Sequence, residues 1–272
     1  MIRNVVNLFA VAAVLAICLP VQPSSAQSVA FVSASGGGSA CTQTAPCGSI
    51  LQGIQSLPIA GGRIVCVTPV LDTAGFGFNN STYIFDCPSA TFLGGITFAG
   101  NNVVLKFQGV AFSGSVIKVS GGGTLILEDC VLEDVAGTAL DIEPNAPFDL
   151  VMKNSRISNN TAVGVLIKPS SGGGSVTATF DGVTITNNAG GLKTDTTNGS
   201  VTVDIFNSTI NKNANNGLIA LGGAGGQNVI TVKNDIIATN GQAGIEASGF
   251  NAGARQQRGA RQQYGRRALS CQ

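Results

Sequence analysis

The sequence contains no histidine and no tryptophan, and only 11% of its residues are charged. Without histidine the chain can form neither a Ser-His-Asp triad, nor a Cys-His pair, nor the HExxH metal motif. It also lacks a Cys-x-x-Cys pair, and five residues separate Cys41 from Cys47, so a zinc site would miss its usual ligands. We therefore predict no metal, no cofactor and no recognisable catalytic residue.

Basic residues are scarce outside the C-terminal end. Five of the 15 Lys and Arg residues follow Ala254, and Arg3 stands near the N-terminus. Acidic residues therefore outnumber basic ones in the body of the chain. Nucleic-acid-binding folds normally carry a basic stripe, so we predict no nucleic-acid partner.

Long apolar runs are missing after residue 26. Before that point, Arg3 precedes an uncharged, mostly aliphatic stretch at residues 5–19, which Pro20 and the small residues 24–26 follow. This order predicts a secretory signal peptide at residues 1–26, cleaved near Ala26. A membrane anchor would need about 20 apolar residues. We expect the mature chain to be secreted, periplasmic or at the cell surface, with no integral membrane span after signal cleavage.

Glycine is abundant, with 37 residues beside many Val, Ile, Thr and Asn, a composition typical of strands and turns. An apolar residue followed by asparagine recurs at Ile157, Ile185, Ile210 and Ile237, and Leu132 precedes them at a similar interval. A period of this size predicts a solenoid of stacked coils. We expect the asparagines to form left-handed turns and to hydrogen-bond from coil to coil.

The N-terminal part adds FVSASG at residues 31–36, APCGSIL at 45–51 and AGGRIVCV at 60–67. With these segments the chain resembles, over residues 31–248, the right-handed parallel β-helix proteins of the pectin-lyase-like superfamily. The resemblance implies an all-β, right-handed parallel β-helix (solenoid) at residues 27–250. It also implies a short capping helix at residues 49–56, whose Ile50, Leu51 and Ile54 would share one face.

The resemblance is much less specific for function, because the superfamily includes lyases, hydrolases, epimerases and adhesins. Relatives that hydrolyse polygalacturonate use Asn-Thr-Asp, Asp-Asp and a histidine motif, and this sequence has none of them. Pectate lyase relatives need aspartates for calcium and a basic residue, and between Lys106 and Lys233 the only arginine is Arg156. We favour a non-catalytic surface or secreted protein. A polysaccharide lyase or glycoside hydrolase with a carboxylate-based site is the alternative.

The repeat offsets also align one outward-facing position of each coil. This column consists of Glu128, Lys153, Asp181, Phe206 and Lys233. With coils about 4.8 Å apart, we expect the first three to form an alternating charge ladder and Lys233 to lie near the face of Phe206. Such a charge ladder would have a structural role only. The same column could instead bind an extended polysaccharide or cell-surface glycan, with sugar rings stacked on the aromatic side chain.

Six cysteines remain after the signal peptide and permit fifteen pairings. Our hypothesis pairs Cys41 with Cys47 and Cys66 with Cys87, because each pair closes a short loop in an exported chain. Cys130 fits a small buried apolar residue.

The repeat ends in an Arg/Gln-rich tail at residues 251–272, with Arg-Gln-Gln at 255–257 and again at 261–263. One interpretation is a disordered basic arm for anionic surfaces. Another is a shifted reading frame, because codons for Arg-Gln-Gln read one nucleotide later encode Asn- and Ser-rich sequence like that of the coils. Sequencing the gene distinguishes the two.

Overall fold

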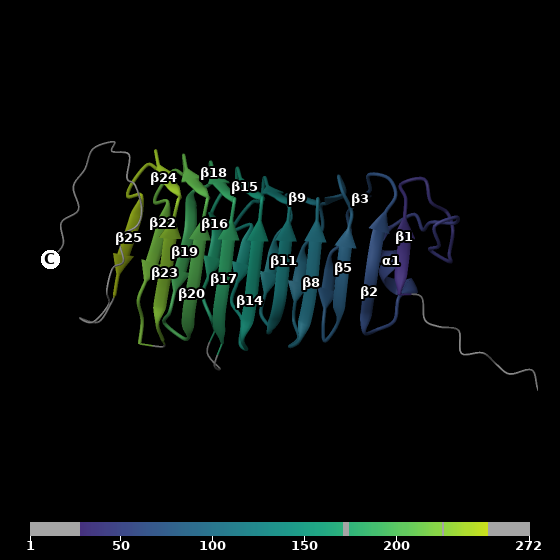
Figure 1. The fold of residues 1–272 in the computed structure, drawn as a ribbon, viewed down its shortest axis with the longest axis horizontal. Coiled ribbons are helices and arrows are strands. Elements are labelled where there is room, and N and C mark those ends of the chain that lie inside the picture. The colour runs from purple at the N-terminus through teal and green to yellow at the C-terminus, as the bar shows by residue number, and fades with distance from the viewer. Residues whose placement is uncertain (1–27, 171–173, 225, 250–272) are drawn as a thin grey trace, which may run out of the picture.

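The computed structural model describes residues 28–170, 174–224 and 226–249. Three parallel sheets run along the molecule, and each coil adds one strand to each sheet (Figure 1). This is the predicted all-β parallel β-helix. The predicted signal peptide and the tail at residues 251–272 lie outside the described residues and stay predictions.

We call the sheets A, B and C. Sheet A comprises β1 (Val29–Val32), β2 (Gly61–Cys66), β5 (Thr82–Asp86), β8 (Val103–Gln108), β11 (Gly123–Glu128), β14 (Phe148–Lys153), β17 (Ser175–Asp181), β20 (Ser200–Phe206) and β23 (Asn228–Lys233). Sheet B comprises β3 (Leu71–Asp72), β6 (Thr91–Phe92), β9 (Ala111–Ser113), β12 (Val131–Glu133), β15 (Arg156–Ser158), β18 (Thr184–Thr186), β21 (Thr209–Asn211) and β24 (Ile236–Ala238). Sheet C comprises β4 (Phe76–Phe78), β7 (Ile96–Phe98), β10 (Ile117–Val119), β13 (Leu140–Ile142), β16 (Val163–Ile167), β19 (Gly190–Asp195), β22 (Leu218–Leu221) and β25 (Ile245–Ser248).

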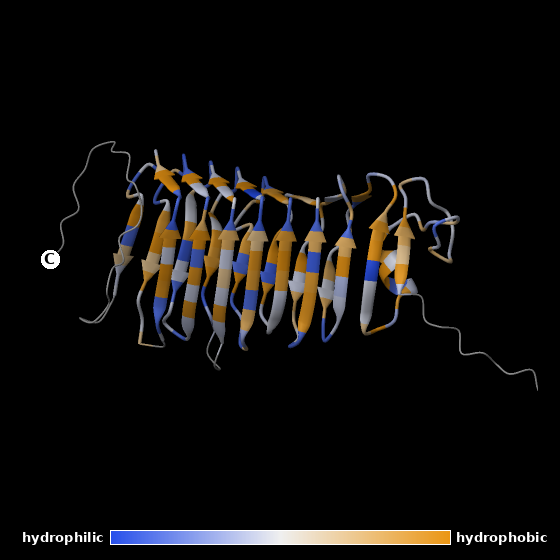
Figure 2. Cartoon of the chain, in the orientation of Figure 1, coloured by the Kyte–Doolittle hydropathy of each residue, from blue (hydrophilic) through white to orange (hydrophobic). Residues whose placement is uncertain are grey.

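Side chains alternate between the interior and the surface along the strands, and Figure 2 shows the matching bands of apolar and polar residues. In sheet A, the inward positions of neighbouring coils are Leu127, Met152, Phe180 and Ile205, all at most 1% exposed. These are the inward residues that the repeat offsets predict. Val232, their counterpart in β23, is only half-buried, because β23 is the last strand of its sheet.

Aromatic rings fill the interior of the first coils. Phe85 and Phe107 stack with ring centroids 4.5 Å apart, and Phe112 meets Phe107 edge to face at 5.2 Å. Such pairs contribute about 0.5–1.5 kcal/mol beyond the area that they bury. Ring contacts therefore join the early coils to one another in addition to the hydrogen bonds of the sheets.

Coil length changes along the chain. In the earlier part, Val103 of β8 pairs with Gly123 of β11, whereas further along Phe148 of β14 pairs with Val176 of β17. The earlier turn of the solenoid therefore uses fewer residues than the later one. The period that the recurring apolar residues predict therefore holds only for the later coils, where those residues lie.

An asparagine ladder lies in the turn between sheets B and C. Nδ2 of Asn160 donates to Oδ1 of Asn188 at 2.8 Å. The same bond joins Asn188 to Asn213 at 3.1 Å and Asn213 to Asn240 at 3.0 Å. The left-handed backbone falls on the preceding residue of each turn: Asn159, Asn187, Lys212 and Thr239. The predicted conformation and ladder both occur, but at neighbouring positions.

The N-terminal end is covered by α1 (Ile50–Ser56). Ser49 is its N-cap and accepts from the amide of Gln52 at 3.3 Å. Ile50 is buried and Ile54 partly buried, but Leu51 is 42% exposed, so placing Leu51 on the inner face was wrong. The inner face uses positions i, i+3 and i+4. Its middle residue is Gly53, where an added Cβ would lie 2.9 Å from Val32 Cγ2.

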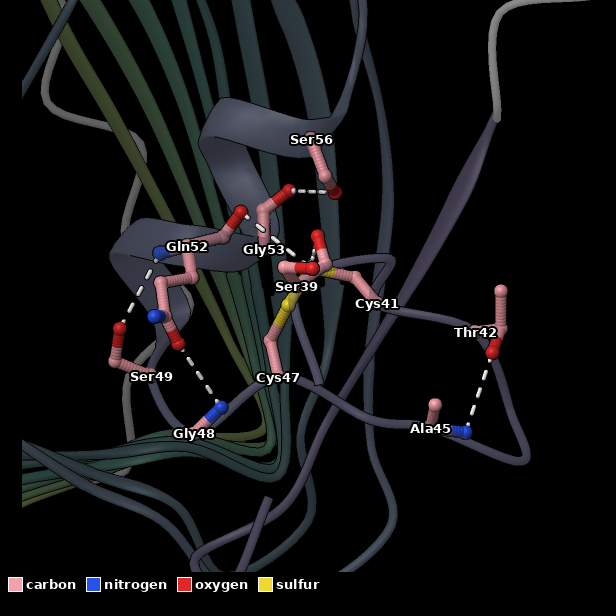
Figure 3. The surroundings of a disulfide bond; sticks show 10 residues. All are labelled: Ser39, Cys41, Thr42, Ala45, Cys47, Gly48, Ser49, Gln52, Gly53 and Ser56. Atoms are coloured by element: carbon pink, nitrogen blue, oxygen red, sulfur yellow. Dashed lines mark hydrogen bonds between the residues drawn. A yellow bond between two sulfur atoms is a disulfide. The ribbon is translucent and has the colours of Figure 1, made fainter. Parts of the chain in front are cut away.

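Two disulfides join Cys41 to Cys47 and Cys66 to Cys87, which is the hypothesised pairing. The first lies beside α1, with Cys41 near Gln52 (Figure 3). The second ties β2 to the residue that follows β5. Both therefore fasten the cap and the first coil. Cys130 is a free buried thiol, and burial raises its pKa to about 11.

Candidate functional site

The register of sheet A aligns the predicted column. Glu128 pairs with Lys153, Lys153 with Asp181, Asp181 with Phe206, and Phe206 with Lys233. Every step is a direct neighbour in the sheet, about 4.8 Å away. Lys153 and Lys233 are exposed, whereas the other three are half-buried. The five side chains thus form one line on the outer face of sheet A, parallel to the axis of the solenoid.

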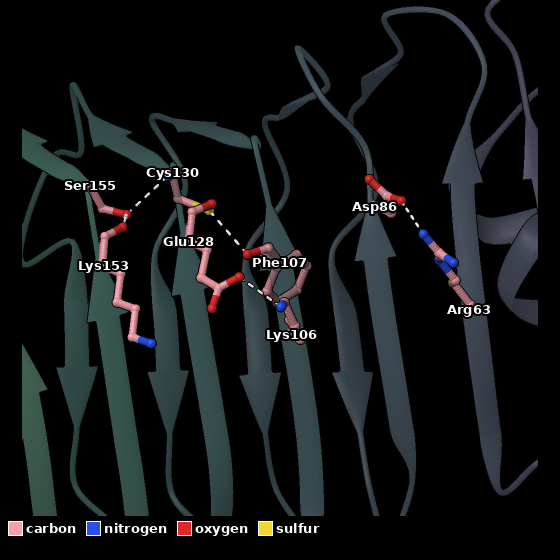
Figure 4. Close-up of polar contacts among 8 residues, drawn as sticks. All are labelled: Arg63, Asp86, Lys106, Phe107, Glu128, Cys130, Lys153 and Ser155. Carbon is pink, nitrogen blue, oxygen red and sulfur yellow. Dashed lines mark hydrogen bonds and ion pairs between the residues drawn. The ribbon is translucent and has the colours of Figure 1, made fainter.

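The ion pairs differ from the predicted charge ladder. Glu128 Oε2 lies 2.6 Å from Lys106 Nζ, and no ion pair joins Glu128 to Lys153 within the described residues (Figure 4). Lys106 lies one coil earlier, two positions before the direct neighbour Gln108. The pair Arg63–Asp86 has the same diagonal geometry, because a long side chain leans along its strand. The predicted pairing of Glu128 with Lys153 is wrong.

The remaining charges of the column have different surroundings. Asp181 Oδ1 accepts from Asn207 Nδ2 at 2.9 Å. Neither Lys153 nor Lys233 has an ion-pair partner in the described part of the chain. The column therefore offers two ammonium groups without an ion-pair partner among the described residues, separated by Asp181 and a half-buried aromatic ring.

A second ladder of polar side chains, which sequence analysis missed, follows the column residues and joins neighbouring coils. Ser155 Oγ accepts from the amide of Cys130 at 3.0 Å and donates to the carbonyl of Lys153 at 2.6 Å. Asp235, in the last coil, accepts from the amides of Ser208 and Lys233 at 2.6 and 2.7 Å. The signal was present in the sequence as Asn-Ser or Asn-Asp directly after the column residue, at 154–155, 207–208 and 234–235.

The surroundings of Asp235 shift the pKa of its carboxyl. Burial raises the pKa of its carboxyl above the ordinary value, the hydrogen bonds from Ser208 and Lys233 oppose that shift, and the charge of Asp181 adds to it. The ladder therefore ends on an acid that is easier to protonate than an exposed aspartate.

Sheet C carries a hollow of about 350 Å³ on another face of the molecule. Asp141, in β13, is one of its lining residues. The remaining lining residues come from the turns before β10 and β13: Gly114, Val116, Val135, Ala136, Gly137 and Thr138. No property of the repeat predicted this site, because its walls are turns that differ from coil to coil.

The Asp141 carboxylate is poorly compensated. Its Oδ2 lies 3.9 Å from Lys118 Nζ, and its Oδ1 is buried without a hydrogen-bond partner among the described residues. Burial raises the pKa of Asp141, Glu143 raises it further, and Lys118 opposes the shift. A carboxyl in such a place can hold a proton more readily than an exposed one, and this is a common property of catalytic acids.

The described residues contain no group of three or more His, Cys, Asp or Glu side chains arranged to bind a metal ion. Nor does any helix among them have the length and apolar character needed to cross a membrane.

The fold and the aligned coils define a right-handed parallel β-helix protein. A family model described as right handed beta helix region matches residues 94–256, and the chain belongs to that family. Searches of curated proteins and of solved structures returned no match.

Proposed function

We propose that the protein is an exported, non-catalytic β-helix that binds an extended polysaccharide along the outer face of sheet A. The alignment of the five column residues along the solenoid axis carries this proposal. An extended glycan laid along that axis would meet one strand after another. Each strand would present it with a carboxylate, an ammonium group or an aromatic ring.

The chemistry of the column suits sugars. Phe206 supplies an apolar ring face, on which sugar rings can stack. Asp181 accepts hydrogen bonds, while Lys153 and Lys233 donate them without competing ion-pair partners in the described residues. Repeated polar groups beside an aromatic surface suit a long, hydroxyl-rich ligand.

Affinity gel electrophoresis against a panel of acidic and neutral polysaccharides tests the proposal. The wild-type protein should be retarded by at least one of them. Phe206→Ala should weaken binding about two- to twelvefold, because stacking contributes about 0.5–1.5 kcal/mol. Asp181→Ala should also weaken it.

Ile236→Ala is the matched control, because Ile236 is an exposed apolar residue of sheet B. It should bind like the wild type. Unchanged binding in both column variants would refute the proposed site on sheet A, and failure of every polysaccharide to bind would refute the function.

A carbohydrate-active enzyme with a carboxylate-based site is the second candidate. The hollow beside Asp141 favours it, because that carboxyl has a pKa raised by burial and, among the described residues, an oxygen without a partner. Incubation with the same polysaccharides should then release unsaturated or reducing-end products. Asp141→Asn should abolish the release, whereas Asp149→Asn, an exposed aspartate of β14, should leave it unchanged.

A further inference from the structure

Asparagine followed by glycine is the dipeptide most open to spontaneous deamidation, because glycine leaves its own nitrogen unhindered. The chain contains three such pairs, at residues 198–199, 216–217 and 240–241. In the reaction the glycine nitrogen attacks the side-chain Cγ of asparagine, and the bond from Cγ to the amide nitrogen breaks. The glycine proton leaves with that nitrogen as ammonia. Water then opens the succinimide to aspartate or to β-linked aspartate.

At two of the pairs the reacting groups are hydrogen-bonded to a neighbouring coil. Asn216 Oδ1 accepts from the amide of Ala243 at 2.8 Å, and Gly217 donates its nitrogen to the carbonyl of Ala243 at 3.0 Å. The nucleophile and the amide that it would attack are therefore both engaged with the next coil.

The pair at 240–241 is held in a similar way by the preceding coil. Asn240 is the last rung of the asparagine ladder, and its Nδ2 also donates to the carbonyl of Ile210 at 3.1 Å. Gly241 donates to the carbonyl of Asn213 at 2.8 Å. Both reacting groups are thus occupied by hydrogen bonds.

Asn198 lacks such hydrogen bonds within the described residues. It lies in the turn between β19 and β20, and its side chain is exposed. In the described part of the chain neither the Asn198 side chain nor the Gly199 nitrogen has a hydrogen-bond partner. The neighbouring Asp195 carboxylate is occupied by Thr197, whose amide and hydroxyl donate to it at 2.9 and 2.6 Å.

We propose that Asn198 is the deamidation site of the folded protein, with water as co-reactant, and that Asn216 and Asn240 are protected by the coil-to-coil hydrogen bonds. The product places a carboxylate, or a backbone lengthened by one methylene, at the turn from sheet C to sheet A. Phe206 lies at the other end of β20, so the modification is independent of the proposed glycan column.

Peptide mapping by mass spectrometry after incubation in mildly alkaline buffer tests the proposal. Trypsin separates the three pairs, because cleavage after Lys193, Lys212, Lys233 and Arg255 gives peptides 194–212, 213–233 and 234–255. Peptide 194–212 should gain mass more than about tenfold faster than the other two, since groups held by coil-to-coil hydrogen bonds react only after local opening. Fragment spectra should place the change at Asn198, and Asn198→Gln should remove it.

The same incubation of the reduced protein in denaturant is the control, and there the three peptides should react at similar rates. Equal rates in the folded protein, or an intact Asn198, would overturn the proposal. So would a preference for Asn198 that persists in the unfolded chain, because local sequence rather than the fold would then decide the site.

Discussion

At the scale of single residues, the asparagine ladder is the most demanding feature, because its members are buried polar side chains. Asn188 accepts from the amide and from Nδ2 of Asn160, and it donates to the carbonyl of Ile157 and to Asn213. It is only 2% exposed, so bulk water does not compete for these hydrogen bonds. Each rung therefore holds two coils in register with a single side chain.

Asn188→Ala should lower the free energy of unfolding by about 2 to 4 kcal/mol, because it leaves several buried groups without partners. Urea unfolding followed by far-UV circular dichroism measures this. Asn187→Gly changes the exposed, left-handed residue of the same turn, which glycine adopts without strain. It should change stability by less than about 0.5 kcal/mol. Equal effects of the two variants would contradict a structural role for the ladder.

Asp141 should make stability depend on pH. Its folded-state pKa is raised by burial, so its contribution is fully present below the ordinary value of 3.8 and is lost as pH rises through the raised folded pKa. Asp141→Asn should therefore raise the melting temperature at neutral pH and have less effect in acid. Melting curves across that range measure it, with Asp149→Asn as the exposed control. A stabilisation as large in acid as at neutral pH would show that the charge is not the cause.

At the scale of elements, α1 packs closely over the N-terminal end of the solenoid because Gly53, on its inner face, has no side chain. Gly53→Val should destabilise the protein by about 1 to 3 kcal/mol, since its Cβ meets Val32 and overpacking costs that much. Leu51→Val, on the exposed side of the same helix, should cost less than about 1 kcal/mol. Thermal unfolding compares the two. Equal melting temperatures of the two variants would mean that the contact with Val32 does not limit how closely α1 packs.

The pairing of the strands could be predicted from the sequence, but the ion pairs and the hollow could not. The register of β11, β14, β17, β20 and β23 could be predicted because the repeat offsets translate directly into strand pairing. The partner of Glu128 could not, because direct and diagonal neighbours are both within reach of a lysine side chain. The hollow at Asp141 was missed for another reason: the turns that line it belong to no repeated pattern, and burial of its carboxylate arises only after the coils stack.

At the scale of the whole molecule, the two ends of the solenoid differ. The N-terminal end is covered by α1 and fastened by two disulfides. At the other end, β23, β24 and β25 are the last strands of their sheets and, among the described residues, pair on one side only. Side chains of this last coil are correspondingly less buried. Ile230 is half-buried, whereas its inner neighbour Val203 is 0% exposed.

In a repeat protein each coil is stabilised by its neighbours, so a coil with one neighbour opens more easily than one with two. We expect amide hydrogen exchange to be fastest in β23 to β25 and slowest in β11 to β17, with β2 well protected between β1 and β5. Mass spectrometry of exchanged peptides measures this gradient. Ile205→Ala should cost about 2 to 5 kcal/mol, and Val232→Ala clearly less, because the cost of truncating a side chain follows its burial. Protection in β23 to β25 as strong as in β11 to β17 would contradict the gradient, and it would mean that the last coil gains a second neighbour from outside the described residues.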